Sequence, residues 1–244
     1  MEEYRIDDLQ IANLFLKQDP NLFCFGTDAV LLANFAAKFI KTESSVIDLG
    51  CGNGIIPVLL SAKCKSDNIC GLELNPRCVE LAQENVVLNN LQNRVKIFSG
   101  DIVSPPEELK KSSFDVVISN PPYIQHKDGA KNNNEHIASA KHEMFCTLKD
   151  VVKCADKMLK FGGVFVMIHR TQRLSEVVCL MHEYKIEPKE IVMIYPNKNK
   201  KSNLFLIKGL KGGGSWCDVL PPIYIYDENG KYTKQVKDIY EIDK

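Results

Sequence analysis

The 244-residue sequence predicts an α/β fold, a doubly wound sheet of seven strands that is mostly parallel and has one antiparallel strand. From residue 45 onward, apolar strand-like runs alternate with helical segments of about ten residues or more, a pattern that produces parallel strands. The last two strand-like runs are joined only by the polar segment 197–202, which cannot hold a crossover helix. That pair is therefore expected to be antiparallel.

Seven segments carry the strand pattern, and they are 44–50, 68–74, 94–101, 113–120, 164–170, 189–196 and 203–209. Helices are expected between them, over 55–64, from Pro76 to about 90, over 141–160 and over about 172–185. Pro76 suits a first helical turn, where its missing N–H removes no hydrogen bond. The pair Gly162-Gly163 is expected to end the helix over 141–160.

Residues 1–43 are expected to form a helical lead-in packed on the core. A short amphipathic helix is predicted from Ile6 to Lys17. The segment 22–39 is predicted to contain a second helix, whose apolar positions from Val30 onward are spaced three and four apart. Thr27 or Asp28 is the expected cap of this second helix.

The segment 44–209 is expected to form the main domain, followed by a C-terminal tail over 210–244. In that tail Asn229-Gly230 is flanked by β-forming residues, which predicts a small hairpin. The tail is interpreted as a surface appendage at the rim of a site.

Composition excludes several function classes. The formal net charge is +0, from 31 basic and 31 acidic residues, so contact with nucleic acid must come from a local patch. The nine cysteines include no CxxC pair, which favours structural thiols in a reducing compartment and no metal site. The start is polar and the apolar runs are too short to cross a bilayer, so we expect a cytoplasmic protein with no membrane contact, and a monomer.

Three glycines at alternate positions, Gly50, Gly52 and Gly54, lie between a predicted strand and a predicted helix. Glycines there allow sharp bends and a close approach of the backbone to a ligand. The spacing differs from the GxGxxG pattern that cradles a pyrophosphate, which indicates a ligand without phosphate at this loop. Asp48, at the strand end before the loop, suits a ligand that carries an ammonium group.

Two further acids end the next two strands. Glu73 lies about twenty residues past the loop, where an acid accepts hydrogen bonds from a ribose diol. Asp101 suits an adenine amino group, and Leu74 and Ile102 follow these acids directly in the same expected site. Together with Asp48, the acids match a ligand with an amino acid end, a ribose and an adenine.

In these features the sequence resembles the class I S-adenosylmethionine-dependent methyltransferases over residues 44–209, and the reversed last strand is a further mark of that family. The resemblance implies a Rossmann-like fold with S-adenosylmethionine as cofactor and S-adenosylhomocysteine as its product.

The fourth strand ends in Asn120-Pro121-Pro122-Tyr123, the expected catalytic motif. The two prolines hold the backbone extended and rigid. The Asn120 side-chain oxygen, also expected beside the cofactor, and the Pro121 carbonyl can accept hydrogen bonds from one NH2 group. Tyr123 offers a flat face for a planar acceptor. The motif resembles the (N/D)PP(Y/F) signature of amino-methyltransferases that act on adenine, guanine or glutamine amide nitrogens.

A narrower resemblance extends over nearly the full length. The segment 23–33, the stretch Ala140-Lys-His-Glu143 and the tail are similar to the bacterial family that methylates the adenine 3′ of the anticodon in a valine tRNA. This resemblance implies N6-methylation of an adenine in an RNA substrate, a tRNA. The expected substrate-side residues are Phe25, Thr27, Asp28, Arg170, Lys198, Lys200 and Lys201.

Other interpretations stay open. The same motif chemistry serves methylation of a glutamine amide in a protein or of a guanine amine in ribosomal RNA. Enzymes of those kinds carry larger N-terminal regions, whereas about forty residues precede the glycine loop here. An RNA-binding protein without activity is disfavoured because the glycine loop and the motif are both intact. The histidines His126, His136, His142 and His169 share no metal-ligand spacing.

Overall fold

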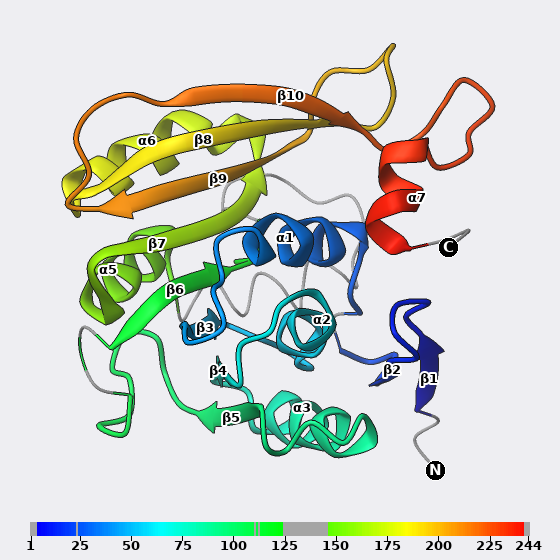
Figure 1. The fold of residues 1–244 in the computed structure, drawn as a ribbon, viewed down its shortest axis with the longest axis vertical. Helices are drawn as coiled ribbons and strands as arrows, with labels where there is room; N and C mark the ends of the chain where they lie inside the picture. The colour runs from blue at the N-terminus through cyan, green and yellow to red at the C-terminus, as the bar shows by residue number, and fades with distance from the viewer. Residues whose placement is uncertain (1–3, 23, 110, 112, 124–145, 242–244) are drawn as a thin grey trace.

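The computed structural model describes all residues except 1–3, 23, 110, 112, 124–145 and 242–244. Its main sheet has eight strands in the order β10-β8-β9-β7-β6-β3-β4-β5 (Figure 1). The strands are β3 (Ser45–Leu49), β4 (Asn68–Glu73), β5 (Val95–Ser99), β6 (Phe114–Ser119), β7 (Leu159–Arg170), β8 (Ile186–Tyr195), β9 (Leu204–Lys211) and β10 (Asp218–Tyr224). The helices are α1 (Thr27–Ala37), α2 (Ile55–Lys63), α3 (Pro76–Leu88), α5 (Leu148–Met158), α6 (Leu174–Glu183) and α7 (Lys234–Tyr240), with a 3-10 turn η1 (Thr171–Arg173).

The predicted topology is confirmed. Strand β9 pairs antiparallel with both β7 and β8, and the other pairs of the main sheet are parallel. The predicted number of seven strands is wrong by one, because β10 from the tail adds to β8 as an eighth strand. The sequence does not predict β10 because Pro221-Pro222 lies inside it, and proline occurs in strands only at a sheet edge or a bulge. Strand β10 is an edge strand with a register shift at these prolines.

Helices cover both faces of the sheet, and each face has its own core. In β3 the side chain of Val46 packs into the core under α1, α2 and α3, whereas that of Ile47 packs into the core under α5 and α6. This alternation follows from the two-residue period of a strand, and both side chains are fully buried. A parallel strand covered on both sides therefore reads as a continuous apolar run.

The predicted helix from Ile6 to Lys17 is wrong. The segment forms an antiparallel hairpin of β1 (Arg5–Asp8) and β2 (Phe15–Gln18), and its turn contains three non-glycine residues with positive φ, namely Gln10, Ala12 and Asn13. Two asparagines of α3 hold β2 from far along the chain.

The side chains of Asn85 and Asn89 each accept a hydrogen bond from one backbone N–H of β2 and donate to the carbonyl of the same residue. Asn85 bonds to Lys17 in this way and Asn89 to Phe15, with donor–acceptor distances of 2.6 to 2.9 Å. Long-range amide pairing of this kind competes with a local helix, and nothing in the segment itself reveals it.

Two further boundaries differ from prediction. The helix expected over 141–160 ends at Met158, and the strand that follows runs through Gly162-Gly163, so the glycines lie inside β7 and do not end the helix. Its expected start at 141 lies outside the described residues. Helix α1 forms as predicted, but its N-cap is Gly26 and not Thr27 or Asp28. The Asp28 side chain accepts a hydrogen bond from the N–H of Ala29 at 2.9 Å, within the first turn.

The tail contributes to the sheet and to a layer beside it. After β10, a bridge between Tyr226 and Tyr232 closes a small hairpin over the predicted Asn229-Gly230 turn, and α7 then packs on α1 (Figure 1). The tail is thus built into the fold. The division of the chain at residues 43 and 209 stays a prediction.

None of the described helices is long and apolar enough to cross a membrane.

Candidate functional site

The predicted site residues lie at one edge of the sheet. Strands β3, β4, β5 and β6 are parallel neighbours, so their carboxyl ends meet at the same edge. Asp48 pairs in register with Gly71 of β4 and Ile118 of β6, and Glu73 pairs with Ser99 of β5. Strand ends at such an edge are where open α/β sheets bind ligands.

The glycine loop follows β3 and bends as predicted. Gly50, Gly52 and Gly54 have φ values of 75°, 55° and 83°, a region that side-chain-bearing residues rarely adopt. Among the described residues, a Cβ added at Gly52 would meet nothing within 4 Å, and one at Gly50 would meet only Ile102, at 3.9 Å. A Cβ at Gly54 would lie 3.1 Å from the Cβ of Ala82 in α3. The first two glycines therefore face open space beside Ile102, and the third allows α2 and α3 to pack closely.

Asp48 is buried beneath this loop. Its side chain is 1% exposed, and neither carboxylate oxygen has a hydrogen-bond partner among the described residues. Burial, reinforced by the nearby charge of Glu73, raises the pKa of Asp48 well above its ordinary value. An unpartnered buried carboxylate is unfavourable unless a ligand compensates it, so the geometry fits a cationic ammonium group.

Glu73 and Asp101 are held by backbone amides. Glu73 accepts hydrogen bonds from the N–H of Gly52 at 2.9 Å and from that of Asn75 at 2.8 Å. The N–H of Val103 donates to Asp101 at 2.8 Å. Each carboxylate oxygen can accept more than one hydrogen bond, so these acids remain able to bind hydroxyl or amino groups while their orientation is fixed.

Leu74, next to Glu73, is 40% exposed at the same edge. An exposed leucine with Ile102 close to the glycine loop offers apolar surface for a flat ring. The unpartnered acid, the open glycine cradle and these side chains fit the three parts of S-adenosylmethionine.

The Asn120-Pro121-Pro122-Tyr123 motif follows β6 and contacts α1. The hydroxyl of Tyr123 lies 2.7 Å from Oδ2 of Asp28 and 2.6 Å from Oδ1 of Asn120, and Nδ2 of Asn120 donates to the same Asp28 oxygen at 3.3 Å. The hydroxyl has one proton, and it can donate to only one of these acceptors at a time. The structure therefore joins Asp28, Asn120 and Tyr123 in one network.

The ring of Tyr123 is enclosed by residues from the end of β7. The guanidinium of Arg170 lies 5.1 Å from the centre of the ring, and the imidazole of His169 contacts it edge-on at 5.4 Å. Burial and the charge of Asp28 raise the pKa of Tyr123 well above its ordinary value, so its hydroxyl is neutral at pH 7. One face of the predicted stacking platform is thus covered by Arg170 in this structure.

His169 is the site residue whose environment the sequence analysis missed. It is fully buried, its Nδ1 accepts a hydrogen bond from the N–H of Arg170 at 2.8 Å, and its Nε2 has no partner among the described residues. Burial, followed by the charge of Arg173, lowers the pKa of His169 to about 4. The ring is therefore neutral at pH 7. The apolar run of β7 around it was the available signal of burial.

The remaining expected substrate-side residues are divided between two places. Phe25 packs partly buried against the core, and Thr27 is hydrogen-bonded to the phenol of Tyr240 in α7. Lys198, Lys200 and Lys201 are exposed on the β8–β9 connection. Because β8 runs parallel to the central strands, this connection also lies at the site edge of the sheet. His126, His136, His142 and the stretch 140–143 lie outside the described residues.

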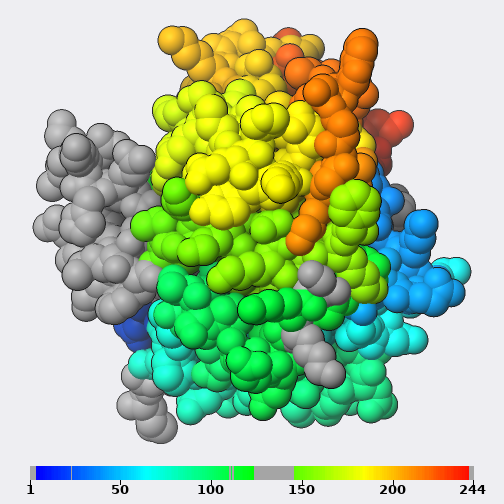
Figure 2. All heavy atoms as spheres, turned by 90° about the vertical axis from the view of Figure 1, so that its left-hand side faces the viewer, coloured from blue at the N-terminus to red at the C-terminus, as the bar shows by residue number. Residues whose placement is uncertain are grey.

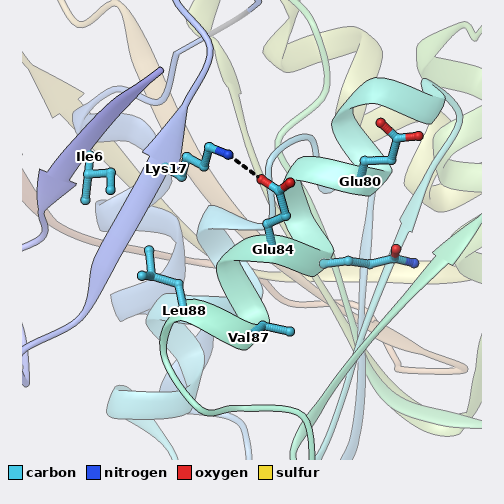
Figure 3. Close-up of a pocket in the computed structure, with 7 residues that line it drawn as sticks. Ile6, Lys17, Glu80, Glu84, Val87 and Leu88 are labelled. Carbon is cyan, nitrogen blue, oxygen red and sulfur yellow. Dashed lines mark hydrogen bonds and ion pairs between the residues drawn. The ribbon is translucent and has the colours of Figure 1, made fainter. Parts of the chain in front are cut away.

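One groove of the molecule lies away from these residues. A groove of about 590 Å³ lies between the N-terminal hairpin and α3 (Figure 3), and its lining residues are Ile6, Lys17, Glu80, Gln83, Glu84, Val87 and Leu88. An ion pair of 2.8 Å between Lys17 and Glu84 crosses it. It contains none of the predicted site residues. Within the described ranges, no three His, Cys, Asp or Glu residues gather as a metal site.

Comparisons with known proteins agree with this geometry. The model of the methyltransferase small domain family matches residues 13–185. Two proteins named tRNA1(Val) (adenine(37)-N6)-methyltransferase are similar to the chain. One, from Glaesserella parasuis, is 27% identical over 237 residues, which are 96% of this chain and 95% of the relative. The other, from Flavobacterium johnsoniae, is 26% identical over 188 residues, 76% of this chain and 77% of the relative.

Among solved structures, a protein described as a predicted O-methyltransferase from Agrobacterium tumefaciens superposes with a TM-score of 0.69 at 20% identity. The match covers 88% of this chain and 95% of that one, and it shows a shared fold. The family match spans well over half of the chain. The chain therefore belongs to the methyltransferase small domain family and is an S-adenosylmethionine-dependent methyltransferase.

Proposed function

We propose that this methyltransferase transfers a methyl group to N6 of an adenine in the anticodon loop of a tRNA, the adenine 3′ of the anticodon in a valine tRNA. The network of Asn120, Tyr123 and Asp28 carries the proposal, because it presents oriented acceptors for one planar amine. The two relatives named for this reaction, one of them aligned over 96% of the chain, support the choice of acceptor.

The cofactor is proposed to lie across the carboxyl ends of β3, β4 and β5. Asp48 would hold the ammonium group of its amino acid end, because no described residue is a hydrogen-bond partner of the buried carboxylate. Glu73 would accept from the ribose hydroxyls and Asp101 from the adenine amino group. Gly50, Gly52 and Gly54 would let the backbone pass close to it, and Leu74 and Ile102 would contact its ring. When bound, S-adenosylmethionine supplies an electrophilic methyl group.

Asn120 is proposed to orient the acceptor amine. An adenine amine is a weak nucleophile because its lone pair is delocalised into the ring. Hydrogen bonds from its two N–H groups to Oδ1 of Asn120 and to the carbonyl of Pro121 would favour a pyramidal nitrogen with its lone pair directed at the methyl group. Pro122 keeps this stretch of backbone rigid. Positioning of this kind supplies most of the rate in such a reaction, and the amine proton leaves once the nitrogen is cationic.

Asp28 is proposed to free Asn120 for the substrate. In the structure Oδ1 of Asn120 faces the hydroxyl of Tyr123 at 2.6 Å. A carboxylate is a stronger acceptor than an amide, so Tyr123 donating to Asp28 leaves Oδ1 of Asn120 available to the amine. The ring face of Tyr123 not covered by Arg170 would receive the base.

The experiment that tests this proposal measures transfer of labelled methyl groups from S-adenosylmethionine to bulk unmodified tRNA, with total protein and ribosomal RNA as parallel acceptors. Nucleoside mass spectrometry identifies the product. N6-methyladenosine in tRNA is the expected result. Label that appears only in protein would replace the proposal with glutamine methylation, and label in ribosomal guanine would replace it with guanine methylation.

A further inference from the structure

Three tyrosines of the tail form a continuous stack. The rings of Tyr226 and Tyr232 are 5.5 Å apart and 11° from parallel, and those of Tyr232 and Tyr240 are 5.6 Å apart and 14° from parallel. Tyr232 and Tyr240 are partly buried, whereas Tyr226, at the outer end, is 40% exposed. The stack therefore presents an aromatic ring at the surface on a rigid base.

An exposed group of lysines adjoins the outer end of this stack. The backbone N–H of Tyr226 donates to the carbonyl of Pro196 at 2.9 Å, which fixes the tyrosine beside the start of the β8–β9 connection. That connection carries Lys198, Lys200 and Lys201, all exposed. None of the three forms an ion pair within the described part of the chain. Their charge is available to an anionic partner.

This surface lies at the same edge of the sheet as the acceptor motif. Strands β8 and β10 run parallel to β6, so the lysine connection and the turn after β10 emerge at the edge where Asn120 follows β6. Figure 1 shows the gold β8–β9 connection and the red turn on one side of the molecule, with α7 against α1. The stack also reaches the site directly, because Tyr240 is hydrogen-bonded to Thr27, the neighbour of Asp28.

The two acids of the hairpin turn act differently on this surface. Asp227 is used within the turn, where its side chain accepts from the N–H groups of Asn229 and Lys231. Glu228 is exposed. Its negative charge repels an anionic partner. A polyanion bound here is therefore attracted by the three lysines, and Glu228 weakens that attraction.

We propose that Tyr226 with Lys198, Lys200 and Lys201, here termed the tyrosine–lysine surface, binds the RNA outside the reacting base. An unpaired base stacks on Tyr226, and the neighbouring phosphates pair with the lysines. Aromatic rings that stack on bases beside cations that follow the backbone are the combination that binds single-stranded nucleic acid. The inference rests on the proposed function, in which RNA is the methyl acceptor, and it adds a surface that binds this RNA.

The test uses the full chain with S-adenosylhomocysteine and measures binding of unmodified bulk tRNA as a function of salt. Tyr226→Ala should weaken binding about 5- to 100-fold, and Tyr226→Phe should bind nearly as wild type, because stacking needs the ring alone. Tyr226→Ala should leave the salt dependence unchanged. The double variant Lys198→Ala/Lys200→Ala should reduce the slope of log K against log salt by roughly 1.4 to 1.8.

Matched controls lie away from the site edge. Trp216 is 90% exposed and precedes β10, in the segment that crosses the opposite edge of the sheet (orange in Figure 2). Trp216→Ala and the exposed α5 pair Lys153→Ala/Lys157→Ala should bind tRNA as wild type does. Glu228→Gln is not a control, because Glu228 lies on the hairpin turn beside the lysines. This variant should bind tRNA more tightly than wild type, since it removes a negative charge that opposes the phosphates.

The outcomes separate the two proposals. Wild type that neither binds nor methylates tRNA overturns the proposed function. If wild type binds and methylates tRNA but Tyr226→Ala and the Lys198/Lys200 variant bind it as tightly as the controls do, the tyrosine–lysine surface alone is overturned. Tyr226→Phe weakened as much as Tyr226→Ala also overturns stacking. Calorimetry with S-adenosylmethionine should give wild-type affinity for every variant in this series.

Discussion

The carboxylate of Asp28 and the hydroxyl of Tyr123 lie 2.7 Å apart although 95 positions separate them in the sequence. Asp28 is in the first turn of α1, before the glycine loop, and Tyr123 ends the acceptor motif after β6. The N-terminal helix α1 therefore contributes to the proposed acceptor site. Because Asp28 also accepts from Nδ2 of Asn120, one carboxylate holds both functional side chains of the motif.

Removing that carboxylate should slow catalysis without releasing the cofactor. In Asp28→Ala, Tyr123 and Asn120 both lose their common acceptor, and kcat should fall about 10- to 100-fold because a small misplacement of a positioning group is enough for such a loss. Asp28→Asn retains an acceptor oxygen for Tyr123, so its kcat should fall less. Single-turnover methyl transfer measures both.

The control for this pair is the affinity for S-adenosylmethionine measured by calorimetry, which should stay within about twofold of wild type in both variants. Equal kcat in wild type and Asp28→Ala would contradict the positioning role. A large loss of cofactor affinity would instead place Asp28 in the cofactor site.

Replacing Asn120 should affect the transfer step more severely than replacing Asp28. Asn120→Ala removes the side-chain acceptor that orients the amine, so kcat should fall roughly 100-fold or more, since orientation supplies most of the rate. Affinity for the cofactor should change little. Rapid-quench transfer and calorimetry on the same preparation separate these effects, and full activity in this variant would remove Asn120 from the mechanism.

The parts that the sequence predicts well are those fixed by local pattern. Glycines with positive φ, the apolar strands and the short connection that makes β9 antiparallel all depend on neighbouring residues, and the structure confirms them. The errors share a different cause. The hairpin at residues 5–18 depends on Asn85 and Asn89 of α3, and β10 depends on pairing with β8.

The same distinction holds within the site. Asp48, Glu73 and Asp101 could be assigned to one edge because parallel strands end there. The role of Asp28 and the contact of His169 with Tyr123 could not, since each depends on a side chain brought by tertiary packing from another element. Local pattern locates a strand end, but contacts between distant elements decide which side chain it meets.

The buried carboxylate of Asp48 should lower the stability of the cofactor-free protein and should also be required for tight cofactor binding. Its pKa is raised in the folded state, so stability is lost as pH rises from the unfolded pKa of about 4 toward the folded value. Asp48→Asn should therefore raise the melting temperature at pH 7 by about 2–4 °C per kcal/mol recovered. The gain should be smaller at pH 5. Its affinity for S-adenosylmethionine should fall.

Scanning calorimetry without cofactor and titration with it provide the two measurements for Asp48→Asn. Glu107→Gln, at an exposed position, is the control and should change neither. Unaltered cofactor affinity in Asp48→Asn would remove the acid from the cofactor site, and a lower melting temperature at pH 7 would show that the carboxylate has a stabilising partner.

His169 should make the protein sensitive to acid. Its folded pKa of about 4 lies below the unfolded value of about 6.5, so the unfolded chain binds the proton first as pH falls. Its contribution to stability is present above pH 6.5 and is lost as pH falls toward 4. From the difference of about 2.5 pKa units, up to about 3 kcal/mol of unfolding free energy should disappear over that window.

Urea unfolding at several pH values tests this, because His169→Gln should lose that part of the pH dependence while His182→Gln, an exposed histidine of α6, should retain it. Protonation of His169 should also disturb the position of Tyr123, since the imidazole ring contacts the Tyr123 ring edge-on. A proton NMR titration assigns the histidine directly. If its ring signal titrates near pH 6.5, His169 is reached by water in solution, and its burial cannot be what supports Tyr123.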